Sequence, residues 1–154
     1  MKYELITTDA KIVSGITLYR IRALQTIGFA VSAGDFGGYI EKEANLSQNG
    51  NAWVYGDAQV SGNAWVYGDA WVYGDAKVST SSDYLQIGPS KSSGRFTTAF
   101  IDSKIGVRVA CGCFTGSVLE FSQEIERTHA KNPEALQQYR LFCQLIAFNF
   151  GVTK

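Results

Sequence analysis

The segment from Gly88 to Thr98 carries the side chains best suited to binding a ligand. Its hydroxyl and cationic residues are Ser90, Lys91, Ser92, Ser93, Arg95, Thr97 and Thr98. Hydroxyls and positive charge, together with backbone N–H groups left accessible at Gly88 and Gly94, can cradle a phosphate group. The segment is not a Walker loop, because its glycines are not followed by Gly-Lys-Ser/Thr. A polar surface loop without a ligand is the alternative interpretation.

Cysteine and histidine are the other residue types that could do chemistry. They are Cys111, Cys113, Cys143 and His129. Zinc ligands are usually separated by about two to four residues, which the Cys-X-Cys run is not, and Cys143 falls on the apolar stripe of a helix. We therefore expect structural thiols, with no metal and no cofactor. The alternative is a thiol enzyme, in which Cys113 precedes a helix N-terminus that lowers its pKa and His129 acts as base.

Residues 50–79 consist of five consecutive hexads with the pattern Gly-Asn/Asp-Ala-X-Val-Tyr/Ser. Ala and Val lie two residues apart and point to the same side of a strand, whereas X and Tyr/Ser point to the other side. Gly-Asn and Gly-Asp tolerate a positive φ, so we expect a corner in each hexad. With degenerate hexads beginning at residue 38, the pattern predicts a β-solenoid over 38–79 in which three hexads close one coil. Stacked coils would place Trp53 over Trp71.

Six aromatic side chains occupy outward positions of these hexads. They are Trp53, Tyr55, Trp65, Tyr67, Trp71 and Tyr73. So many rings cannot all face water without forming an apolar patch. They form a self-stacked or covered ladder, the subunit interface of a homo-oligomer, or a stacking platform for a base or sugar.

The flanking segments complete a single domain over 1–154. A capping box at Ser117 and Glu120 begins one helix, and Asn132-Pro133 begins a second. The expected parts are N-terminal strands (1–37), the β-solenoid (38–79), a loop and β-hairpin (80–116) and two helices (117–150). The predicted fold class is therefore mainly β with an α+β cap: a short hexapeptide-repeat β-solenoid flanked by N-terminal strands, a C-terminal β-hairpin and two helices.

Several further segments occur in the same order in one protein family. They are Tyr19-Arg20-Ile21, the run from Gly34 to Glu43, Asn45-Leu46-Ser47, the hexads, Ile87-Gly88-Pro89 and the run from Cys111 to Gly116. In these segments the chain resembles the small hexapeptide-repeat proteins of bacteriophages and prophages that are loosely called polymer-forming cytoskeletal proteins. The resemblance covers nearly the whole chain. It implies a phage protein in the bacterial host cytoplasm, and it brings no established activity.

The hexads also resemble those of left-handed β-helix proteins, which favours a left-handed coil. Tyr or Ser directly after Val departs from that pattern and leaves the hand open. A hexapeptide acyltransferase is disfavoured, because such enzymes use a histidine base near the coils and the one histidine here, His129, lies outside them.

Charge and hydropathy exclude other classes of protein. Lys and Arg number 14 and Asp and Glu number 14, with no basic segment, so general nucleic-acid binding is not expected. The sequence contains no apolar run long enough to span a membrane, and residues 1–5 lack the apolar core of a signal peptide. Three cysteines suit a reducing cytosol.

The resemblance to phage proteins implies a role in antagonising host defence, and the absence of a catalytic constellation in the sequence favours a non-enzymatic protein. We expect it to form a homo-oligomer and to sequester a small nucleotide-type signal through the 90–98 segment, with aromatic residues at a subunit boundary closing the pocket. The alternative is a protein-binding inhibitor of a host defence enzyme, of the anti-CRISPR or anti-restriction type, that uses the aromatic face. A small-molecule-processing enzyme built on Cys113 and His129 is the third hypothesis.

Overall fold

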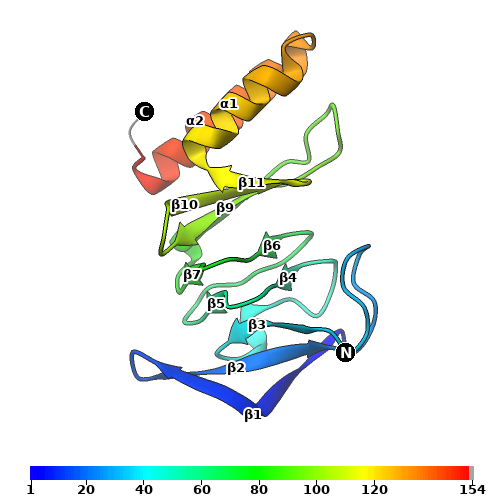
Figure 1. Cartoon of the computed structure of the whole chain (residues 1–154), viewed down its shortest axis with the longest axis vertical. Helices are drawn as coiled ribbons and strands as arrows, with labels where there is room; N and C mark the ends of the chain where they lie inside the picture. The colour runs from blue at the N-terminus through cyan, green and yellow to red at the C-terminus, as the bar shows by residue number, and fades with distance from the viewer. Residues whose placement is uncertain (153–154) are drawn as a thin grey trace.

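The computed structural model describes residues 1–152, which form four layers along the long axis of the molecule (Figure 1). The N-terminal hairpin lies at one end, and the hexads lie on it. A four-stranded sheet follows, and two helices cover the far side of that sheet. The hexads and the four-stranded sheet are the two layers that matter most for the site described below.

The N-terminal layer is an antiparallel hairpin of β1 (Tyr3–Val13) and β2 (Ile16–Ala23). Its turn contains Ser14 and Gly15, both with positive φ. Strand β3 (Phe36–Ile40) pairs antiparallel with β2 on one side and parallel with residues 59–60 of the second hexad on the other. The hairpin is thereby joined to the repeat through backbone hydrogen bonds.

The hexads form four strands of two residues each. They are β4 (Trp53–Val54), β5 (Gln59–Val60), β6 (Trp71–Val72) and β7 (Lys77–Val78). Strand β4 pairs in parallel with β6, so Trp53 is opposite Trp71, and β5 pairs in parallel with β7. The predicted register of three hexads is therefore confirmed. We call residues 50–79 the hexad stack.

The inward positions of the hexad stack are fully covered. Every Ala and Val of the repeat, from Ala52 to Val78, is at most 1% exposed. This confirms the alternation read from the sequence, because side chains two residues apart on a strand share a face.

The predicted fold class is wrong, since residues 1–152 form a mixed α/β arrangement of separate sheets and no solenoid or closed sheet. Strands β5 and β7 belong to a five-stranded sheet of order β1-β2-β3-β5-β7, whereas β4 and β6 form a sheet of two strands. The physical reason is that the repeat supplies few stacked levels. Antiparallel strands from the N-terminal hairpin extend one side of it into an open mixed sheet.

Side chains from the N-terminal half satisfy carbonyl groups at the edge of the hexad stack. The Lys2 ammonium donates to the Ala52 carbonyl at 2.8 Å, and the Asn45 amide donates to the Ala64 carbonyl at 2.8 Å. The Tyr3 hydroxyl donates to the Leu46 carbonyl at 2.7 Å, beside the stack. These bonds matter because a buried carbonyl without a partner is costly.

Beyond the hexad stack, four antiparallel strands form a sheet of order β11-β10-β9-β8. They are β8 (Tyr84–Ile87), β9 (Thr97–Asp102), β10 (Gly106–Cys111) and β11 (Phe114–Ser117). Two short 3-10 helices, η1 (Glu43–Asn45) and η2 (Ser81–Asp83), precede and follow the repeat. Phe100 on one face of the sheet joins the core of the hexad stack, while Val109 on the other face packs with the helices.

The helices are α1 (Val118–His129) and α2 (Pro133–Phe150). The predicted capping box is confirmed, because the Ser117 hydroxyl accepts from the Glu120 N–H and the Glu120 carboxylate accepts from the Ser117 N–H. Buried Phe121, Tyr139 and Ile146 form a second core against the sheet. Within residues 1–152, neither helix is both long and apolar enough to cross a membrane.

Candidate functional site

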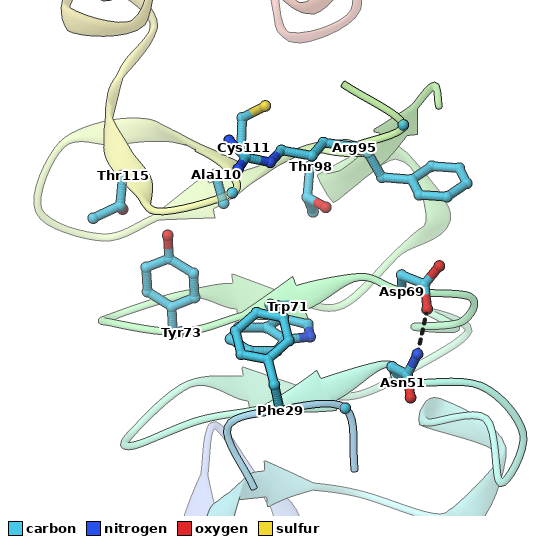
Figure 2. Close-up of a pocket in the computed structure, with 14 residues that line it drawn as sticks. Phe29, Asn51, Asp69, Trp71, Tyr73, Arg95, Thr98, Ala110, Cys111 and Thr115 are labelled. Atoms are coloured by element: carbon cyan, nitrogen blue, oxygen red, sulfur yellow. Dashed lines mark hydrogen bonds between the residues drawn. The ribbon is translucent and has the colours of Figure 1, made fainter. Parts of the chain in front are cut away.

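A pocket of about 450 Å³ lies between the hexad stack and the four-stranded sheet (Figure 2). Its lower side is formed by hexad residues 51, 69, 71 and 73 together with Phe29. Its upper side is formed by the segment from Gly94 to Thr98 and by the turn that joins β10 to β11. The pocket thus lies where two layers meet, and both layers contribute side chains to it.

Aromatic rings form the lower wall of the pocket. The centroid of the Trp71 ring lies 5.4 Å from that of Phe29 and 5.4 Å from that of Tyr55. Phe29 belongs to a small loop held by a bridge between Ile27 and Val31, and its side chain is 94% exposed. Because Phe29 is exposed and lies beside Trp71, the two rings offer an apolar surface that a planar ligand can cover.

Arg95 supplies the positive charge on the upper side. Its side chain extends toward the β10–β11 turn, as Figure 2 shows. There it lies so close to Gly112 that a Cβ added at that glycine would be 2.8 Å from the Arg95 Nη1 atom. Within residues 1–152, no carboxylate lies within ion-pair distance of Arg95, so its guanidinium is available to an anion.

Hydroxyl groups line the remainder of the pocket. Thr98 extends into it from β9, and the Tyr73 hydroxyl faces Thr115 across it (Figure 2). Burial raises the pKa of Tyr73 above its ordinary value, an effect that a hydrogen bond with Thr115 partly opposes. The phenol therefore stays protonated at neutral pH and can donate a hydrogen bond.

The structure divides the predicted ligand-binding segment into four groups. Arg95 and Thr98 line the pocket. Ser90 and Ser93 instead form a hydrogen-bonded cluster with the Tyr139 hydroxyl, in which each oxygen–oxygen distance is 3.0 Å or less. Thr97 is fully buried. Its side chain lies on the opposite face of β9 from Thr98, because successive side chains of a strand alternate between the two faces.

Lys91 and Ser92 lie at a second, smaller cleft of about 310 Å³ beside the start of α2. The Lys91 N–H donates to the Gln138 side chain at 2.9 Å, which ties the segment to the helix. The hydroxyl-rich segment therefore serves mainly to attach the sheet to α2, and two of its residues, Arg95 and Thr98, reach the pocket.

The six aromatic residues of the hexads lie in different environments. Trp71 and Tyr73 line the pocket, and Tyr55 packs against Trp71. Trp53 fits the expected alternative of a covered ring. It is fully buried beneath Tyr3 of the N-terminal hairpin, with ring centroids 6.3 Å apart.

Trp65 and Tyr67 remain on the surface, where they are 55% and 43% exposed. Their rings stack on each other at 4.7 Å between centroids. These two residues of the predicted interface are thus accessible to a partner, and they lie outside the pocket.

Sequence reasoning missed Phe29, Asn51, Asp69 and Gly112 as residues of the pocket. The repeat held a signal for two of them, because Asn51 and Asp69 occupy the same position of hexads that stack directly. The segment around Phe29 has no periodicity, and its approach to Trp71 depends on long-range packing.

Within the described part of the chain, no hydrogen bond connects Cys113 and His129, the thiol and the base of the enzyme hypothesis. Cys113 is exposed in the turn between β10 and β11, whereas the His129 ring stacks on Tyr139 at 4.9 Å between centroids. Cys111 lines the pocket, but its sulfur points away from it (Figure 2). Within residues 1–152, no three His, Cys, Asp or Glu side chains are grouped so as to hold a metal ion.

No protein-family model matches the chain, and no curated protein matches it either.

Proposed function

We propose that the protein binds a small nucleotide-type ligand in the pocket between the hexad stack and the sheet, without transforming it. The observation that carries the proposal is that Trp71 and Arg95, from two segments singled out separately in the sequence, line the same pocket. A planar ring system joined to an anion is the ligand chemistry that this combination suits.

The aromatic wall would hold the base. Stacking of a base on an aromatic side chain contributes about 1–3 kcal/mol. Phe29 and Trp71 offer adjoining rings, and Phe29 is almost completely exposed. Covering those rings removes apolar surface from water, which adds to the stacking energy.

The upper side would hold the phosphate. The Arg95 guanidinium presents several N–H donors in one plane, the geometry that phosphate oxygens accept from. Thr98 and Thr115 add hydroxyl donors on the same side of the pocket. The volume of about 450 Å³ falls within the range of about 300–1,000 Å³ typical of small-molecule sites.

The biological role in this proposal is sequestration of a nucleotide signal used by host defence, in the cytoplasm of an infected bacterium. The support for this role is the resemblance of the hexads and flanking segments to small phage proteins. A protein that only sequesters its ligand needs closely placed contacts, and the pocket brings aromatic, cationic and hydroxyl side chains together.

Native mass spectrometry with a panel of cyclic and ADP-ribose-type nucleotides tests the proposal. We expect the protein to gain the mass of an intact nucleotide, to release it unaltered on denaturation, and to lose it in Arg95→Ala. Failure to retain any nucleotide would overturn the proposal. Release of an altered nucleotide, with loss of the conversion in Cys113→Ala, would support the enzyme hypothesis instead.

A second candidate function is protein binding through Trp65 and Tyr67. These stacked rings are exposed, as the residues of an unoccupied interface must be, and they lie outside the nucleotide pocket. The partner in this proposal is a second copy of the chain or a host defence enzyme. Trp65→Ala should lower the oligomer mass or weaken capture of that enzyme, while nucleotide binding stays unchanged.

A further inference from the structure

Asn51 and Asp69 form a polar pair at one end of the aromatic wall. They occupy the corner position of hexads that stack on each other, and both line the pocket. The Asn51 amide Nδ2 donates to the Asp69 Oδ1 at 2.9 Å, as the dashed line in Figure 2 shows. The bond fixes the orientation of the carboxylate beside the pocket.

The Asp69 carboxylate still has acceptor capacity. A carboxylate offers about four lone-pair sites. Within residues 1–152, the Asn51 amide is its one hydrogen-bond donor, and no cation lies within ion-pair distance of it. The corresponding Asp75 differs, because it is paired with the Lys104 ammonium at 2.8 Å. Of these two corner carboxylates, Asp69 is therefore the one open to a ligand.

A carboxylate distinguishes between bases by the donors on their edges. Guanine presents two adjacent donors, N1–H and the N2 amino group, which the two oxygens of a carboxylate accept together. Adenine and cytosine present one amino donor next to a ring nitrogen that is itself an acceptor, and that nitrogen repels a carboxylate. Uracil presents one donor between two acceptors. The edge of guanine is thus the best match for Asp69.

We propose that the pocket selects a guanine nucleotide, with Asp69 reading the base edge, the Phe29–Trp71 wall stacking the ring and Arg95 holding the phosphate. This inference rests on the proposed function and specifies the base. The polar pair and the cation lie on opposite sides of the pocket, so base and phosphate each have a separate contact.

Calorimetric titration of the full chain with GMP, IMP and AMP tests the selection. The three nucleotides share the same phosphate and ribose, so their differences in affinity report on the base alone. GMP should bind at least about tenfold more tightly than AMP, because a bidentate contact discriminates by about that factor or more. IMP keeps N1–H but lacks the amino group, and it should fall between them.

Asp69→Asn is the decisive variant. Asparagine already occupies the same corner in two other hexads, at Asn51 and Asn63, so the backbone accepts it. An amide offers one donor and one acceptor, which match the edge of adenine, so the preference for GMP should disappear. Asp57→Asn makes the same change at a corner outside the pocket and should leave the preference intact.

The outcomes separate the two proposals. Preference for AMP in the wild type, with binding of both nucleotides lost in Arg95→Ala, would overturn guanine selection and leave nucleotide binding standing. Equal loss of GMP preference in Asp57→Asn would also overturn it. No binding of any of the three, nor of the wider nucleotide panel, would overturn both.

Discussion

The Arg95 guanidinium lies directly over Gly112, whose missing side chain makes room for it. A Cβ at residue 112 would be 2.8 Å from the Arg95 Nη1 atom and 3.1 Å from its Cζ atom. Gly112 also has a φ of +59°, a conformation that other residues rarely adopt. The turn between β10 and β11 therefore determines where the one pocket-lining guanidinium can lie.

Gly112→Ala should weaken nucleotide binding by displacing Arg95. We expect affinity to fall about tenfold or more, since a charged hydrogen bond is worth about 1.5–3 kcal/mol. Gly106→Ala is the matched control, because Gly106 also has a positive φ but a Cβ there would meet no atom within 4 Å. Both variants should lose comparable stability in urea unfolding, and equal affinities in calorimetry would contradict the role given to Gly112.

Arg95→Gln should lower nucleotide affinity by about 10- to 100-fold, because it removes a charge-assisted contact with phosphate. The remaining affinity should also depend less on salt, which calorimetry at two ionic strengths measures. Lys91→Gln removes the same charge from the same segment outside the pocket. An equal loss in both variants would show that charge acts at long range and that the pocket contact is absent.

Phe29→Ala should weaken binding by about 5- to 100-fold, the range that corresponds to loss of one stacking partner. Its thermal stability should change little, because the ring is 94% exposed. Phe148→Ala removes a ring that is 87% exposed on α2, far along the chain from the pocket. Unchanged affinity in Phe29→Ala would contradict a role for the aromatic wall in nucleotide binding.

The Lys2 ammonium should make stability depend on pH. Burial lowers the pKa of Lys2 from 10.5 to about 8 in the folded protein. The unfolded chain therefore binds more protons between these two pH values, so the free energy of unfolding should rise as pH increases from about 8 to 10.5. Urea unfolding of wild type and Lys2→Met measures this, with the variant lacking that rise. A parallel pH dependence in both proteins would be inconsistent with a Lys2 whose pKa is lowered by burial.

Local patterns in the sequence predicted individual secondary-structure elements better than the packing of these elements against one another. Burial of Val54 and Val72 follows from strand alternation, and the Ser117 cap follows from side chains near in sequence. Burial of Trp53 does not follow from any local pattern, because it depends on Tyr3, which belongs to a hairpin distant in the sequence. The same hairpin extends the repeat into a mixed sheet and makes the predicted solenoid wrong.

In the candidate site too, residue types could be predicted from the sequence, whereas their long-range packing could not. Composition indicated Arg95 and Thr98 and also the aromatic hexads, because charged, hydroxyl and aromatic side chains suit a nucleotide. It could not show that Ser90 turns toward Tyr139, since that depends on the packing of α2 against the sheet. Nor could it show that Phe29 reaches Trp71, because no repeat or alternation covers that loop.

The most direct measurement is two-dimensional NMR of the three tryptophan indole N–H groups during titration with GMP. The chain has three tryptophans in three settings: Trp71 in the pocket, Trp53 buried, and Trp65 on the surface outside the pocket. We predict that the chemical shift of the Trp71 indole N–H changes until the pocket is saturated, while the signals of Trp53 and Trp65 do not move. A saturable shift at Trp65 with Trp71 unmoved would contradict it, as would three unmoved signals at millimolar nucleotide.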